Sequence, residues 1–113
     1  FAGLVGGLGF ASSAQFGESG VAVFEPTHGS APKYADYETP IVNPIAMFLS
    51  ACLMLDYLQE KELATKIENA ISKVVADGKV RTYDMMKLSG SPDVVRKGAV
   101  STVQMTDAII SAL

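Results

Sequence analysis

Residues 45–58 constrain the fold of this chain more than any other part of the sequence. The stretch is apolar almost throughout, with Ser50 and Asp56 as its polar interruptions. At about 1.5 Å of helix per residue, it is well short of the roughly 20 residues that cross a bilayer. A helix that is apolar on nearly all faces is buried between other elements. We therefore expect a core helix that begins at Asn43-Pro44, because Asn is a favoured N-cap and Pro suits the first helical position.

A β-hairpin is expected upstream of this helix. Residues 11–16 and 21–24 form two short runs, and the second is rich in β-branched and aromatic side chains, which favour strands. Residues 17–20 between them begin and end with glycine, as a tight turn requires.

The glycine-rich start imitates a dinucleotide-binding fingerprint. Gly7 and Gly9 have the spacing of Gly-x-Gly-x-x-Gly, but Ser12 occupies the last position. The Rossmann fingerprint also needs a helix directly after the turn, and here a hairpin is expected. We therefore reject a Rossmann site.

Three further helices are expected downstream. Apolar residues recur every three or four positions over residues 60–76, which predicts an amphipathic helix that ends at Gly78. A short helix is expected over residues 82–89. Ser101 and Gln104 form a capping-box sequence, which predicts the start of a last helix. The expected architecture is α/β, with one hairpin and four helices.

Composition narrows the functions that are open to the chain. Its 113 residues are 49% hydrophobic with a net charge of −3, which fits one globular domain, or a piece of one, rather than a disordered segment. The sequence has no run of Lys or Arg, so we expect neither a nucleic-acid partner nor a membrane partner. The chain starts in apolar residues without a targeting signal, as a piece of a longer protein would.

The lone cysteine and the scattered acids carry little functional signal. Cys52 is the single cysteine, which excludes an internal disulfide and a cysteine metal cluster and favours a reducing compartment. We expect it to be a buried small hydrophobe. Four acids lack metal-ligand spacing and are expected on solvated faces or as caps: Asp56, Asp77, Asp84 and Asp93.

A long loop, residues 25–43, is the best candidate for a functional site. Four of the five prolines lie in it or at its end, and a structureless stretch of this length is usually functional. It contains the only histidine, His28. Small residues at 29–31 let backbone N–H groups approach a ligand, and Lys33 and Tyr34 add a cation and a phenol. These groups suit a nucleotide, while an ordered turn with a surface histidine is an equally weighted alternative.

The centre of this loop resembles a known family. It reads Phe24-Glu25-Pro26-Thr27-His28-Gly29-Ser30-Ala31-Pro32-Lys33-Tyr34-Ala35. With the downstream Asn-Pro pair and apolar helix, it closely resembles the isocitrate/isopropylmalate dehydrogenases, which are metal-dependent β-decarboxylating enzymes. Residues 3–9, 82–84 and 101–110 resemble the family too. The resemblance implies an isopropylmalate-dehydrogenase-like α/β fold with a non-Rossmann cofactor site, of which residues 1–113 form a C-terminal part.

The resemblance also implies an adenosine site in this loop. His28 and Asn43 would contact the adenine, and the backbone of residues 29–32 would line the adenosine. The implied cofactor-binding residues are His28, Gly29, Ser30, Ala31, Pro32, Lys33, Tyr34, Asn43, Tyr83 and Lys87.

Four of these residues bear on the choice between NADP and NAD. Lys33 and Tyr34 stand where NAD-dependent members carry an acidic residue, a pattern similar to that of NADP-dependent isocitrate dehydrogenases. Tyr83 and Lys87 match the family's other 2′-phosphate contacts, and we expect them on one helical face because they lie four residues apart. NADP is therefore the implied cofactor.

Two departures from the family weaken this preference. Lys87 stands where Arg is common, so the charge is kept but the bidentate fork is lost, which leaves NAD as the alternative cofactor. Residues 36–40 lengthen the loop and add Asp36 and Glu38, whose charges oppose a phosphate unless they face solvent.

The implied reaction is oxidation of a 2-hydroxy acid by hydride transfer to NADP, with metal-assisted loss of a carboxylate. Isocitrate to 2-oxoglutarate, a step of the tricarboxylic acid cycle, is the implied conversion. The alternatives are a part of an NAD-dependent 3-isopropylmalate or homoisocitrate dehydrogenase, or of a non-catalytic subunit. The family's catalytic residues and its Mg²⁺ or Mn²⁺ ligands lie upstream, so this chain alone is expected to be inactive. The family also implies a homodimer, in the cytoplasm or in the mitochondrial matrix of a eukaryote.

Overall fold

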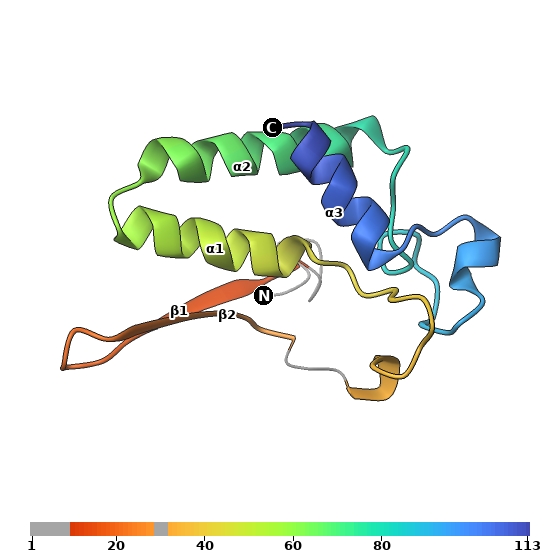
Figure 1. Cartoon of the computed structure of the whole chain (residues 1–113), viewed down its shortest axis with the longest axis horizontal. Coiled ribbons are helices and arrows are strands. Elements are labelled where there is room, and N and C mark those ends of the chain that lie inside the picture. The colour runs from red at the N-terminus through yellow and green to blue at the C-terminus, as the bar shows by residue number, and fades with distance from the viewer. Residues whose placement is uncertain (1–9, 29–31) are drawn as a thin grey trace.

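A computed structural model describes residues 10–28 and 32–113, which form a mixed α/β arrangement (Figure 1). Strands β1 (Ser12–Phe16) and β2 (Ala22–Pro26) pair antiparallel, with the first residue of β1 opposite the last residue of β2. The N–H of Gly17 donates to the carbonyl of Val21 at 2.7 Å, and Gly20 turns the chain with a φ of 85°. The predicted hairpin is confirmed, and a strand rather than a helix follows the glycine-rich start.

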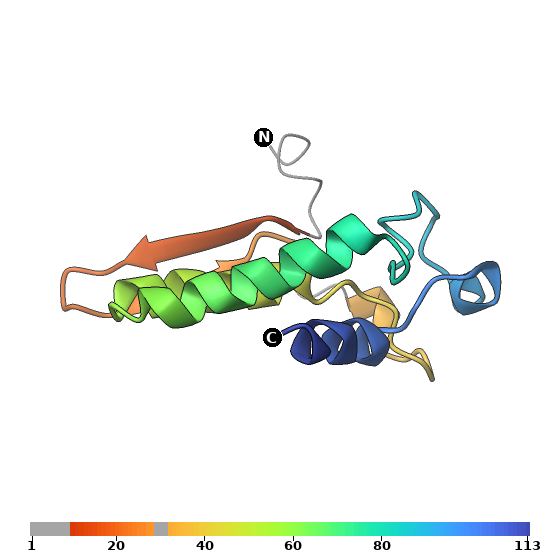
Figure 2. The ribbon, with the colours of Figure 1, turned by 90° about the horizontal axis from the view of Figure 1, so that it is seen from above.

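Helix α1 (Ile45–Tyr57) lies between the hairpin on one side and helix α2 (Lys61–Asp77), which runs in the opposite direction, on the other (Figures 1 and 2). The predicted core helix is confirmed. Its expected burial on nearly every face is wrong, since Met47 and Met54 are 58% and 40% exposed. The hairpin and α2 cover only part of its circumference. No helix of the described ranges is long and apolar enough to cross a membrane.

The start of α1 is held by the predicted asparagine. Pro44 occupies the position before the helix, and the side-chain oxygen of Asn43 accepts from the N–H of Ile45 at 2.9 Å. This bond satisfies one of the donors that a helix start leaves without a partner. The predicted capping role of Asn43 is confirmed, with the helix boundary shifted by one residue.

The main core lies where α1, α2 and helix α3 (Thr102–Ser111) meet. Its buried members are Ile45, Ala70, Ile71, Val74, Met105 and Ile109. Gly78 ends α2 with a φ of 71°, a left-handed conformation that suits glycine, as predicted. The predicted capping box opens α3: Ser101 Oγ accepts from the N–H of Gln104 at 3.1 Å, and Gln104 Oε1 accepts from the N–H of Ser101 at 2.8 Å.

The third predicted helix, over residues 82–89, is wrong. The structure has a run of turns there, in which the N–H of Lys87 donates to the carbonyl of Asp84 at 3.1 Å. Lys87 then takes a φ of 59°, which stops a right-handed helix from continuing. Two short 3-10 helices, η3 (Pro32–Tyr34) and η4 (Val94–Lys97), complete the described elements.

Cys52 lies inside the α1–α2 contact. It is 2% exposed, and its Sγ lies 3.7 Å from the carbonyl oxygen of Ala64 in α2. The prediction of a buried small hydrophobe is confirmed.

Candidate functional site

The predicted site loop leaves β2 and re-enters regular structure at η3, at the end of the molecule away from the hairpin turn (Figure 1). His28 is half-buried just after β2, and Lys33 is exposed within η3. Gly29, Ser30 and Ala31 lie outside the described residues. The loop is therefore described at its two ends, which are the strand exit and the short helix.

Tyr34 is the centre of an aromatic cluster at this end. Its ring meets Tyr37 edge-on, with centroids 5.5 Å apart, and it meets Tyr83 at 6.0 Å with the planes tilted by 58°. The Lys33 ammonium lies 5.0 Å from the centroid of the Tyr34 ring, within cation–π range. The structure thus brings together three of the predicted site residues, two from η3 and one from the distant 82–87 turn.

A small apolar core supports this cluster from behind. Ile41, Val94 and Ala99 are buried, and the three tyrosines of the cluster pack against them together with Met86 and Leu88. A cavity of about 280 Å³ lies beside the cluster, and its lining residues are Tyr34, Ala35, Tyr37, Pro40, Ile41, Val42 and Thr102. Because the rings rest on packed side chains, their positions are set by tertiary structure rather than by the loop alone.

The two phenols at the centre differ in their acidity. A hydrogen bond with Tyr83 lowers the pKa of Tyr34, and a hydrogen bond and the positive charge of Lys33 lower it further, against a smaller opposing effect of burial. Burial raises the pKa of Tyr83, and its hydrogen bond with Tyr34 adds to the rise. The bond between the two hydroxyls uses one of their two protons, so one O–H of the pair remains for an acceptor outside it.

Asn43 joins the site loop to the 82–87 turn. It is 3% exposed, and its Nδ2 donates to Asp84 Oδ2 at 3.0 Å while its Oδ1 accepts from the start of α1. Thr82 Oγ1 donates to the other oxygen of Asp84 at 2.5 Å. Both polar atoms of the Asn43 side chain thus have a partner within the protein.

Asp84 is therefore a structural residue that the sequence analysis missed. It was expected on a solvated face or as a cap, yet it is half-buried and accepts from both Thr82 and Asn43. The spacing of Thr82 and Asp84, two residues apart, is a signal for such a local bond. The bond to Asn43 spans 41 residues and has no local signal.

Lys87 does not share a helical face with Tyr83, because the 82–87 segment is a turn. It is exposed, and in the described part of the chain neither Lys33 nor Lys87 lies within 4.0 Å of a carboxylate oxygen. The added acids Asp36 and Glu38 are both exposed. The ammonium groups of Lys33 and Lys87 are therefore not neutralised by ion pairs with described acids.

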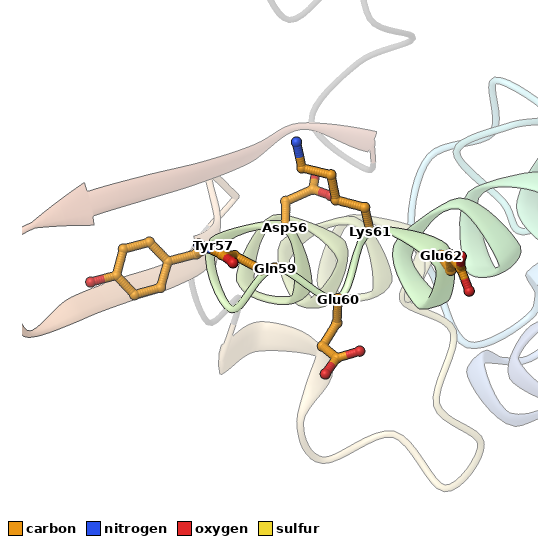
Figure 3. A pocket seen from close by; sticks show the side chains of 6 residues that line it. All are labelled: Asp56, Tyr57, Gln59, Glu60, Lys61 and Glu62. Carbon is orange, nitrogen blue, oxygen red and sulfur yellow. The ribbon is translucent and has the colours of Figure 1, made fainter.

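A second hollow lies at the opposite end, where α1 turns into α2 (Figure 3). Its volume is about 650 Å³, and its lining residues are Asp56, Tyr57, Gln59, Glu60, Lys61 and Glu62. Three carboxylates against one ammonium make it acidic. Among residues 10–28 and 32–113, no three His, Cys, Asp or Glu side chains gather in a way that could hold a metal ion. The described residues therefore do not fit a divalent metal centre.

Comparisons with known proteins indicate one family over almost the whole chain. The family model for isocitrate/isopropylmalate dehydrogenase matches residues 1–109. An NADP isocitrate dehydrogenase of Thermus thermophilus is 46% identical over 98% of this chain and 20% of its own length. Catalytic subunit 5 of an NAD isocitrate dehydrogenase of Arabidopsis thaliana is 41% identical over 99% of this chain and 26% of its own length.

The fold is similar to that of a solved relative as well. A crystal structure of isocitrate dehydrogenase from Methylococcus capsulatus superposes with a TM-score of 0.80 at 37% identity, over 98% of this chain and 29% of that one. The chain thus spans between a fifth and a third of the length of these relatives.

Proposed function

Since the chain belongs to the isocitrate/isopropylmalate dehydrogenase family, whose members are oxidoreductases, we propose that it is the NADP-binding portion of a metal-dependent oxidative decarboxylase. The substrate is a 2-hydroxy acid, with isocitrate to 2-oxoglutarate as the conversion. We further propose that residues 1–113 are the C-terminal part of a longer enzyme that acts as a homodimer.

The observation that supports this proposal is the arrangement of Lys33, Tyr34 and Tyr83. The Lys33 ammonium supplies a cation, and the hydrogen-bonded pair of Tyr34 and Tyr83 supplies one remaining O–H donor, to a phosphate dianion. Lys33 is exposed and lies beyond ion-pair distance of every described carboxylate, so its charge is free for a ligand. The residues present therefore fit the 2′-phosphate of NADP.

The adenosine part of the cofactor is assigned to the neighbouring residues. In the proposal, His28 and Asn43 contact the adenine, and the backbone of residues 29–32 lines the adenosine. Lys87 supplies a second positive charge to the phosphate in this proposal. The half-burial of His28 beside the strand exit and the fixed amide of Asn43 support this assignment.

Bound NADP would supply the hydride acceptor of the reaction. The residues of this chain hold and orient its adenosine end. The described residues do not fit the metal, so metal-bound and substrate-bound steps are assigned to the remainder of the longer enzyme.

NAD is the second candidate cofactor, and one observation in the site favours it: Lys87 lacks the bidentate fork of Arg. An NAD-dependent relative is also 41% identical to this chain.

The test is an assay of the longer enzyme that carries this chain. Isocitrate, 3-isopropylmalate and homoisocitrate are each offered with Mn²⁺ and either NADP or NAD. The proposal predicts the highest kcat/KM for isocitrate with NADP. A higher kcat/KM for 3-isopropylmalate or homoisocitrate with NAD would contradict it, and no turnover with any pair would favour a non-catalytic subunit.

A further inference from the structure

Gly90 touches the ring at the centre of the site. A Cβ placed on Gly90 would clash with the Tyr34 hydroxyl oxygen and would lie 2.8 Å from both Cε1 and Cζ of that ring. Real Cβ atoms essentially never approach another heavy atom closer than 3.0 Å. The Tyr34 phenol therefore occupies space that exists only because residue 90 has no side chain.

The backbone does not explain a glycine at this position. The described glycines with positive φ are Gly20, Gly78 and Gly98, whereas Gly90 has a φ that any residue can adopt. The three heavy atoms nearest to a Cβ on residue 90 all belong to the Tyr34 side chain. The requirement for glycine thus comes from contact with Tyr34 and not from a turn.

The Tyr34 ring has little room to move aside. Tyr37 lies against it at 5.5 Å, Tyr83 at 6.0 Å, and the buried Ile41, Val94 and Ala99 support it from behind. A Cβ on residue 90 would therefore displace the hydroxyl end of the ring, where it pairs with Tyr83. The displaced group is the one that the proposed function assigns to the 2′-phosphate.

We propose that Gly90 is a positioning residue, which holds the Tyr34 hydroxyl in place for the nucleotide 2′-phosphate and so contributes to selectivity for NADP over NAD. This inference rests on the proposed function. Gly90 makes no contact with the phosphate itself in this proposal and acts through Tyr34.

The experiment measures the dissociation constants of NADP and NAD for the longer enzyme with Gly90→Ala. The loss of one hydrogen bond to a charged group corresponds to a roughly tenfold or greater rise in the NADP constant. The NAD constant is expected to stay within about twofold, because NAD lacks the 2′-phosphate. Gly17→Ala is the matched control, since its Cβ would have 3.3 Å to its nearest neighbour and its φ is also not positive.

Tyr34→Ala separates the two proposals. In that background Gly90→Ala should change neither constant, because the ring that the new Cβ would strike is gone. The positioning role is wrong if the wild-type enzyme prefers NADP and the Gly90→Ala enzyme does not fold. It is also wrong if the wild-type enzyme prefers NADP and Gly90→Ala weakens the binding of NADP and NAD equally. A wild type without preference for NADP, unchanged by Tyr34→Ala, overturns the proposed function itself.

Discussion

The side-chain amide of Asn43 donates to the carboxylate of Asp84 at 3.0 Å, and this bond joins two segments that lie 41 residues apart. Asn43 sits at the start of α1, and Asp84 is in the turn that carries Tyr83. The bond therefore fixes the distance between the site loop and the turn. Together with packing on the small apolar core, it keeps the turn that carries Tyr83 close to the site loop.

Removal of this carboxylate should destabilise the protein. Asp84→Ala leaves the buried Asn43 N–H and the Thr82 hydroxyl without their acceptor, which costs about 1–3 kcal/mol of unfolding free energy. Urea unfolding measures the loss. Asp107→Ala on the exposed side of α3 is the control and should stay within about 0.5 kcal/mol of the wild type. Equal stability of the two variants would contradict the account.

Two adjacent isoleucines in α3 should differ sharply in their contribution to the free energy of unfolding. Ile109 is 1% exposed in the main core, whereas Ile110 is 55% exposed. We expect Ile109→Ala to cost about 2–5 kcal/mol of unfolding free energy, since it leaves a cavity among packed side chains. Ile110→Ala should cost less than about 1 kcal/mol. Thermal or urea unfolding of the two variants checks the orientation of α3. A larger loss of stability in Ile110→Ala than in Ile109→Ala would show that the helix is rotated.

The tyrosine pair should titrate as a unit. The chain has four tyrosines and no tryptophan, and the difference in ultraviolet absorbance between a variant and the wild type follows tyrosinate formation at the affected phenols. Tyr83→Phe removes the hydrogen bond that lowers the pKa of Tyr34, so the first phenol to ionise should do so at higher pH than in the wild type. Tyr57→Phe, beside the hairpin, should leave that first ionisation where it is. An unchanged first ionisation in Tyr83→Phe would mean that the two hydroxyls are not bonded in solution.

The buried thiol of Cys52 should be protected from thiol reagents. It should also make the free energy of unfolding depend on pH in the alkaline range. Burial raises the pKa of Cys52 to about 11, and the charges of Glu68 and Asp56 add to the rise. The unfolded thiol has a pKa of about 8.5. Because the folded state holds the proton more tightly, this contribution to stability is complete below the unfolded pKa and is lost as pH rises through the folded one.

A thiol reagent at neutral pH measures this protection directly. The folded protein should react far more slowly than the same protein in denaturant. Rapid reaction of the folded protein would show that the α1–α2 contact around Cys52 opens readily.

Local chemistry was sufficient to predict several elements of this fold. The capping box at Ser101, the left-handed stop at Gly78 and the glycine-bounded hairpin turn each depend on residues within a few positions of one another. The 82–87 turn depends instead on a partner across the fold, Asn43, and no periodicity over residues 82–89 encodes that partner. The helix predicted there failed for this reason.

The candidate site, too, could be predicted from the sequence only in part. The motif around Lys33 and Tyr34 marked the loop, and the pairing of Tyr34 with Tyr83 agrees with the expected cluster. The contact of Gly90 with the Tyr34 ring could not be predicted, because it arises only when two distant segments are packed together. The contact of Tyr37 with the Tyr34 ring could not be predicted either. The acidic residues beside Tyr37 in the sequence indicated a departure from the family and gave no sign of this contact.

The affinity of Lys33→Asp for NADP and for NAD tests the central claim most directly. Loss of the ammonium and its replacement by a carboxylate should raise the NADP dissociation constant by at least about tenfold and leave NAD unchanged or tighter. Lys73→Asp, the same charge change on the exposed face of α2, is the control and should alter neither constant. If Lys33→Asp binds NADP as tightly as the wild type does, the assignment of this cluster to the 2′-phosphate is wrong.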